Sequence, residues 1–280
     1  MSIGLVLEGG AMRGMYTAGV LDVFMENEIK VDGIIGVSAG VLFGVNYLSN
    51  QIGRAIRYNK KFVKNSNYMG FKSLLLTGNV INKEFAFYEV PSKLDFFDNE
   101  TYVKSNVPFY ATITNVDTGK PEYIEVKDVF KQMEVLRASS AMPYVSKIVE
   151  YGGQKYLDGG ISDSIPVGKC RELGFEKVIV VLTRTLEYRK KKSNKIFPKL
   201  KYSKYPNFVR TLNSRYKMYT ETVEKIIDLE DKKEIFVIRP SRKVKIKRIE
   251  RDENKLQEMY DLGRKDCENK LESLKEWIKA

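Results

Sequence analysis

The sequence predicts an α/β protein with three layers, in which helices cover both faces of a mostly parallel central sheet. Short apolar runs rich in β-branched residues alternate with helical stretches over the first two-thirds of the chain. This alternation is typical of parallel strands joined by crossover helices. Two later stretches, with apolar residues every three or four positions, predict a helical C-terminal extension.

The first predicted strand, Ile3–Leu7, leads into a glycine-rich turn at residues 8–14, E-G-G-A-M-R-G, and a helix over residues 11–27. Backbone N–H groups at such a turn, beside the positive end of a helix dipole, favour an anion. An oxyanion-binding turn is one interpretation. The others are a tight strand–helix junction and a dinucleotide-binding turn of the G-x-G-x-x-G type, with Ala11 at the middle glycine.

The second predicted strand runs through Ile34 and Val37 into a sharp turn that carries Ser38, before a helix over Ala39–Leu48. Gly36 and Gly40 flank this serine at two residues on either side. A nucleophile on a strained strand-to-helix turn requires small neighbours of this kind. The pattern therefore favours a catalytic hydroxyl at Ser38, with an ordinary serine in a glycine-rich turn as the alternative.

A predicted hairpin of residues 147–151 and 154–157 ends in Asp158-Gly159-Gly160. A carboxylate at a strand end, followed by residues that allow close backbone approach, can present a base in a cleft. A plain turn is the alternative, and Asp163 is the competing carboxylate. The other elements are predicted at residues 51–64, 128–137 and 166–173 as helices, at 107–114, 122–126, 177–182 and 235–238 as strands, and at 208–228 and 256–278 as helices.

The amino-acid composition excludes several kinds of catalytic and metal site. The 280 residues include no histidine, which excludes a Ser-His-Asp triad and any zinc site built on imidazole. A base for Ser38 would have to be a carboxylate, a lysine or a less usual group. Cys170 and Cys267 match no metal or redox spacing. We expect no metal and no cofactor. The chain lacks a membrane-spanning apolar run and a signal-like N-terminus, so we expect a cytoplasmic protein.

Positive charge is concentrated toward the C-terminus. The net charge is +12, and residues 184–217 hold twelve basic residues against one acid. We divide the chain into a main domain at residues 1–185 and a basic, mainly helical extension at 186–280 packed on it. The basic segment 184–217 has three interpretations: a solvated cationic face, peripheral contact with an anionic membrane, and, least favoured, nucleic-acid binding.

Residues 65–105 are the least informative part of the sequence. They contain an apolar patch at 71–76 and an aromatic cluster that includes Phe85, Phe87 and Tyr88. Core packing or a lid is the favoured interpretation, and a wall that binds an acyl chain is the alternative.

Three separated motifs occur together in the order found in patatin-like phospholipases: the 8–14 turn, the Ser38 turn G-V-S-A-G, and Asp158-Gly159-Gly160. The chain resembles a bacterial member of that family over residues 3–185. The stretches 113–119, 139–143 and 164–167 also resemble it.

The resemblance implies a serine acyl hydrolase, a phospholipase or esterase that cleaves lipid carboxylic esters through a Ser38–Asp158 dyad and an acyl-enzyme. Carboxylesterase or thioesterase activity on other acyl substrates is the alternative, and a non-catalytic nucleotide or nucleic-acid binder is a remote one. The implied oxyanion hole comprises Gly9, Gly10, Ala11, Arg13 and Gly14. The implied supporting glycines are Gly36 and Gly40 at the turn, with Gly159 and Gly160 after the aspartate.

Overall fold

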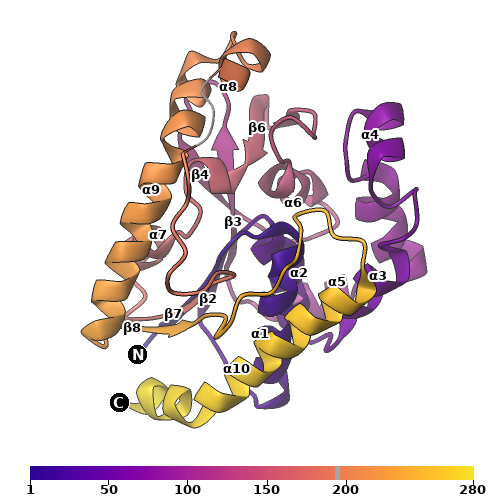
Figure 1. Cartoon of the computed structure of the whole chain (residues 1–280). Coiled ribbons are helices and arrows are strands. Elements are labelled where there is room, and N and C mark those ends of the chain that lie inside the picture. Colours follow the sequence, from indigo (N-terminus) through magenta and orange to yellow (C-terminus); the bar gives the residue numbers. More distant parts are fainter. Residues whose placement is uncertain (193–195) are drawn as a thin grey trace.

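Within residues 1–192 and 196–280, which the computed structural model describes, an eight-stranded sheet lies between layers of helices (Figure 1). The strand order is β5-β6-β3-β2-β1-β7-β8, and β4 pairs with β3. The strands are β1 Ile3–Leu7, β2 Gly33–Val37, β3 Phe109–Asn115, β4 Pro121–Glu125, β5 Val149–Tyr151, β6 Gln154–Asp158, β7 Lys177–Val181 and β8 Ile235–Ile238.

The helices occupy most of the intervening chain. The α-helices are α1 Met15–Glu26, α2 Ala39–Leu48, α3 Arg54–Phe62, α4 Phe71–Thr77, α5 Asn99–Lys104, α6 Met133–Ser140, α7 Val167–Glu172, α8 Ile196–Lys201, α9 Pro206–Asp231 and α10 Glu253–Lys279. Ala11–Gly14 and Gly159–Ile161 are 3₁₀ turns, and Glu84–Leu94 is a π-helix. None of the described helices is long and apolar enough to span a membrane.

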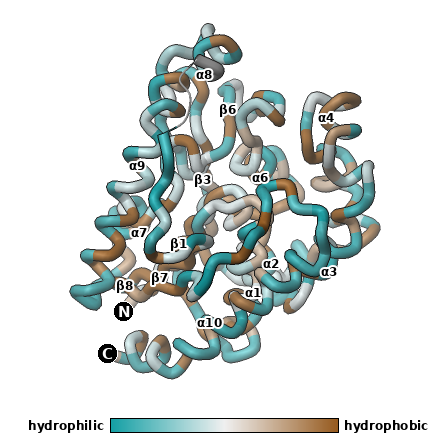
Figure 2. The backbone as a smooth tube through the Cα atoms, viewed as in Figure 1, coloured by the Kyte–Doolittle hydropathy of each residue, from teal (hydrophilic) through white to brown (hydrophobic). Residues whose placement is uncertain are grey.

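The predicted fold class is confirmed. Strands β3, β2, β1, β7 and β8 are parallel, and antiparallel strands complete the sheet. Side chains alternate between the two faces of a strand. Leu5 and Leu7 of β1 therefore pack against the layer that contains α1, α2 and α10, whereas Val6 packs against α7 and α9. Figure 2 shows the apolar character of β7 and β8 against the largely hydrophilic surface of α10.

The C-terminal segment contributes to this sheet. Strand β8 pairs with β7 in parallel from Val178 opposite Ile235 to Val181 opposite Ile238. Helix α10 lies along α1 on one face of the sheet, and α9 covers the other (Figure 1). The division of the chain at residue 185 stays a prediction from composition, and the two parts share one sheet.

Some element boundaries differ from the predicted ones. The helix expected at residues 128–137 begins at Met133, because the Asp128 carboxylate accepts a hydrogen bond from the Lys131 N–H and closes a separate turn. The helix expected at 51–64 is the shorter α3. Residues 65–105, which the sequence left without elements, contain α4, the π-helix and α5.

Helices α1 and α10 cross at two glycines. A Cβ atom on Gly263 would lie 2.1 Å from the Tyr16 carbonyl oxygen, and one on Gly19 would lie 2.2 Å from the Tyr260 carbonyl oxygen. The hydroxyl of Tyr260 donates to Asp22 at 2.5 Å, and that of Tyr16 donates to Asp266 at 3.2 Å. The backbones approach closely because neither glycine has a side chain.

This crossing predicts the effect of adding one methyl group. We expect Gly263→Ala to lower the free energy of unfolding by about 1–3 kcal/mol, because backbone atoms of α1 would have to move. Gly168→Ala is the matched control: no atom lies within 4 Å of its added Cβ, and we expect unchanged or slightly higher stability. Urea unfolding followed by circular dichroism measures both. Equal free energies for the two variants would contradict the close crossing.

Candidate active site

The edge of β3 brings Ser38 and Asp158 together. Parallel β2 pairs with residues 109–112 of β3, and antiparallel β6 pairs with residues 113–115. Strand β4 overlaps both partners along β3, so it occupies the opposite edge. Strands β2 and β6 therefore run toward each other along one edge. Val37 is paired with Thr112 and Asp158 with Ile113, which are successive residues of β3.

The Ser38 turn has the strained backbone that the sequence predicts. Ser38 has φ +54° and ψ −116°, in a region that L-residues rarely adopt. A Cβ on Gly40 would lie 2.5 Å from the Leu7 carbonyl oxygen, and one on Gly36 would lie 2.9 Å from the Gly40 carbonyl carbon. Both glycines therefore support the turn by close packing and do not line the pocket.

Ser139 holds this turn in place, a role that sequence reasoning did not assign. The Ser38 N–H donates to the Ser139 Oγ at 2.9 Å, and this hydroxyl donates to the Thr112 carbonyl oxygen at 2.7 Å. Ser139 is fully buried in α6. The only signal for it was its position in the small-residue stretch 139–143.

Asp158 is buried, with 7% of its surface exposed, beside a Ser38 that is 6% exposed. Burial raises the pKa of the Asp158 carboxyl, and this effect exceeds the opposing effects of Arg215, the Gly160 N–H and the Ser38 hydroxyl. The Gly160 N–H donates to the Asp158 carboxylate at 2.8 Å. A Cβ on Gly159 would lie 2.1 Å from the Thr112 carbonyl oxygen, so a larger residue there would displace β6.

The 8–14 turn lies against Ser38. A Cβ on Gly9 would be 3.2 Å from the Ser38 Cβ, and one on Gly14 would be 2.7 Å from the Ala39 Cβ. Ala11 adopts φ +49°, the left-handed conformation that alanine disfavours. No residue of the described chain accepts a hydrogen bond from the N–H of Gly10 or Ala11. These two donors are therefore available to a ligand.

A cavity of about 870 Å³ contains these groups. Of the predicted site residues, it is lined by Gly9, Gly10, Ala11, Arg13, Ser38, Asp158 and Gly160. Gly14, Gly36, Gly40 and Gly159 lie behind it as packing residues. Residues 65–105 do not contribute to its wall. Phe87 is buried in the core, Phe85 and Tyr88 are partly buried against it, and Phe71 of α4 is 76% exposed.

The competing carboxylate, Asp163, lies outside this cavity. It accepts hydrogen bonds from the Tyr123 hydroxyl at 2.7 Å and from the Ile165 N–H at 3.3 Å. Burial raises its pKa also, but its partners are structural. The described residues include no group of three or more carboxylate or thiol side chains arranged to hold a metal ion.

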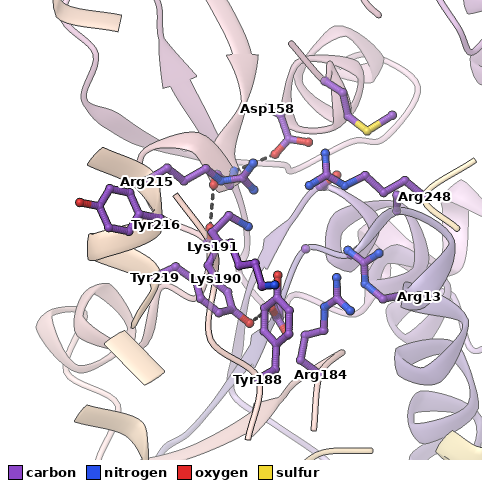
Figure 3. Close-up of a pocket in the computed structure, with 18 of the residues that line it drawn as sticks. Arg13, Asp158, Arg184, Tyr188, Lys190, Lys191, Arg215, Tyr216, Tyr219 and Arg248 are labelled. Carbon is purple, nitrogen blue, oxygen red and sulfur yellow. Dashed lines mark hydrogen bonds between the residues drawn. The ribbon is translucent and has the colours of Figure 1, made fainter. Parts of the chain in front are cut away.

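The sequence did not predict that basic side chains surround Asp158. We define the basic cluster as Arg13, Arg184, Lys190, Arg215 and Arg248, all of which line the cavity (Figure 3). Arg215 and Arg248 point toward Asp158 from two sides (Figure 3). Apart from Arg13, these residues lie in two charge runs, 184–217 and 239–251, the second of which has seven basic residues and one acid. The charge runs did not reveal whether these side chains face solvent or a pocket.

Only part of the 184–217 segment lies on the surface. Lys199, Lys201 and Lys204 are exposed, whereas Lys190 and Arg215 are half-buried at the cavity. Residues 193–195 of this segment lie outside the described residues. Contact of the segment with an anionic membrane stays a prediction.

Comparisons with known proteins identify two regions. Residues 5–170 match the patatin-like phospholipase family, and residues 205–279 match a domain of unknown function, DUF6363. The solved structure of VipD from Legionella pneumophila has a TM-score of 0.41 and 12% identity to this chain, with coverage of 96% of this chain and 67% of VipD.

Two curated relatives are each similar to about two-thirds of this chain. The Escherichia coli K12 protein named "Uncharacterized protein YjjU" is 32% identical over 186 residues, which are 65% of this chain and 52% of that protein. Lysophospholipase nte1 of Aspergillus fumigatus is 28% identical over 190 residues, 64% of this chain and 12% of the fungal protein. This chain therefore matches about half of the first relative and about an eighth of the second. The 5–170 match spans more than half of the chain and includes Ser38, Asp158 and the 8–14 turn, so the chain belongs to the patatin-like phospholipase family.

Proposed function

We propose that this chain is a serine acyl hydrolase that cleaves carboxylic ester bonds of lipids with a Ser38–Asp158 dyad. The observation that carries the proposal is the juxtaposition of a strained serine and a buried carboxylate of raised pKa in one cavity. Family membership and the lysophospholipase relatives support lipid esters as the substrate class.

Asp158 acts as the base in the first step. Its carboxylate accepts the Ser38 proton as the hydroxyl oxygen attacks the ester carbonyl carbon. A carboxylate in water is a weak base for a hydroxyl, because its pKa is far below that of serine. Burial raises the pKa of Asp158 and so makes it a stronger base. The Gly160 N–H holds one carboxylate oxygen at 2.8 Å and fixes the orientation of the group.

The free N–H groups of Gly10 and Ala11 stabilise the oxyanion of the tetrahedral intermediate. The intermediate collapses with loss of the alcohol, which takes the proton from Asp158, and leaves an acyl-Ser38 ester. Water then attacks this ester and loses a proton to Asp158. The fatty acid leaves, and the proton returns to the Ser38 oxygen.

Ester or thioester hydrolysis on smaller acyl substrates uses the same groups and is the second candidate. The cavity also has apolar wall residues, Met142, Pro143 and Val145, which suit an acyl chain. A panel of p-nitrophenyl esters of increasing chain length, with a phospholipid alongside, separates the candidates. Preference for long chains supports a lipid hydrolase.

The dyad predicts two inactive variants. Ser38→Ala and Asp158→Asn should each lower kcat/KM for a p-nitrophenyl ester by about 10³-fold or more, and fluorophosphonate should fail to label Ser38→Ala. The matched control is Asp163→Asn, which alters a half-buried carboxylate outside the cavity and should retain activity. Full activity in Ser38→Ala, or equal losses in both Asp→Asn variants, would contradict the assignment.

The pH profile gives an independent test of Asp158. Because the base must be ionised and its pKa is raised, the acid limb of kcat/KM should lie above the usual range for aspartate. Arg215 lowers the pKa of Asp158, so Arg215→Gln should move this limb to higher pH. Profiles of both proteins with a neutral ester test this direction. A limb that moves to lower pH in Arg215→Gln would count against Asp158 as the base.

A further inference from the structure

The cavity wall has a large excess of positive charge. Eight basic and three acidic residues line it. Of the acids, Glu8 is already occupied: its carboxylate accepts from the Thr183 N–H at 2.5 Å, the Thr183 hydroxyl at 3.0 Å and the Tyr219 hydroxyl at 2.8 Å. Within the described residues, no member of the basic cluster forms an ion pair. A buried or half-buried cation without a carboxylate partner costs free energy, and a bound anion offsets that cost.

The cluster is assembled from distant parts of the chain. Arg13 belongs to the 8–14 turn, Arg184 and Lys190 follow β7, Arg215 lies on α9, and Arg248 lies between β8 and α10. Figure 3 shows their head groups directed into one space beside Asp158. Arg248 is held there by its backbone, because its carbonyl oxygen accepts the Met12 N–H at 3.4 Å.

Two guanidinium groups have unused donors inside the protein. The Nε atoms of Arg13 and Arg215 are buried and have no hydrogen-bond partner among the residues that the structure describes. An unpaired buried donor is rare in proteins and indicates a missing ligand or water. Two guanidinium groups facing one space match the geometry of a phosphate, which accepts two parallel hydrogen bonds from each.

Partial burial and mutual repulsion both lower the pKa values of cations in this cluster. Burial lowers the pKa of Lys190 to about 7, with added repulsion from Arg215, Arg248 and Arg13. The pKa of Arg13 falls to about 10 from burial and from repulsion by Arg184 and Arg248. The side chains of Tyr188 and Tyr219 lie against Arg184 and Lys190 at 4.1 and 4.9 Å from the ring centres, so aromatic faces hold two of the cations in place.

We propose that the basic cluster binds the phosphate of an acyl substrate, and that the enzyme prefers esters whose head group carries two negative charges close to the scissile bond. The 205–279 region therefore serves head-group recognition, since it supplies Arg215 and Arg248. Both arginines act on Asp158, so the bound phosphate lies near the reacting ester, as in a glycerophosphate monoester. This substrate class rests on the proposed ester hydrolysis.

Three substrates with one oleoyl chain test the preference: lysophosphatidic acid, lysophosphatidylcholine and monooleoylglycerol in the same neutral detergent micelles. We expect kcat/KM for lysophosphatidic acid to exceed the other two by about tenfold or more, the size of one charge-assisted contact. Arg248→Gln should reduce this ratio severalfold. Arg210→Gln is the matched control, because Arg210 is an exposed α9 residue outside the cavity, and it should keep the wild-type ratio.

Inorganic phosphate separates a head-group site from a site for a free anion. It should inhibit lysophosphatidic acid hydrolysis competitively and should not stimulate monooleoylglycerol hydrolysis. Stimulation would assign the cluster to a free effector anion and overturn the proposal.

Fluorophosphonate labelling of Ser38 distinguishes a failure of the head-group preference from a failure of the proposed hydrolase activity. Hydrolysis of all three lipids at equal kcat/KM, with normal labelling, would overturn the head-group preference and leave the hydrolase intact. Absence of hydrolysis in every arm, together with absence of labelling, would overturn both. Circular dichroism of Arg248→Gln and Arg210→Gln checks that each variant is folded.

Discussion

The shared edge of β3 is the constraint on which the site depends. A parallel strand and an antiparallel strand end against successive residues of β3, so Ser38 and Asp158 meet without any long loop to position them. Backbone hydrogen bonds of the sheet set their separation, and the Ser139 hydroxyl fixes the turn between β2 and α2. Because Gly159 contacts the Thr112 carbonyl oxygen, β6 can lie this close to β3 only without a side chain at that position. The relative placement of Ser38 and Asp158 is therefore a property of the sheet.

The environment of Asp158 balances two opposing effects. Burial disfavours its charged form, which strengthens it as a proton acceptor, while Arg215 and Arg248 favour that form. The same cations repel one another, so the positive charge on the cavity wall is unfavourable at several positions. An anion would relieve this repulsion and also reduce the effect of the arginines on Asp158. In our proposals, Arg215 and Arg248 therefore couple substrate binding to the strength of the base. A substrate that carries a phosphate would make Asp158 a stronger proton acceptor when it binds.

Much of the candidate site could be predicted from the sequence because the patterns that mark it are local. The Ser38 turn needs Gly36 and Gly40 within two residues, and a buried strand needs a short β-branched run, so both leave compact patterns in the sequence. Two features could not be predicted: the antiparallel pairing of β6 with β3, and the direction in which the basic side chains point. Both depend on contacts between residues far apart in the chain. Arg215 lies on α9, whose apolar residues pack against the sheet. The spacing of apolar residues does not reveal which polar residue at the edge of a helix faces a cavity. Ala11 is a case in which a local rule fails. Alanine disfavours positive φ, yet Ala11 has φ +49° in the folded chain.

The position of β8 at the end of the parallel core bears on how the chain is made. Ile3 of β1 pairs with Lys177 of β7, and within the described residues the outer edge of β7 is paired with residues 235–238. During synthesis the N-terminal part emerges first, and the edge of β7 stays open until the region after α9 leaves the ribosome. An open apolar strand edge is a template for pairing with other chains. The growing chain therefore passes through an interval of some fifty residues of elongation, on the order of 3–10 seconds at typical rates, in which this strand edge is unpaired.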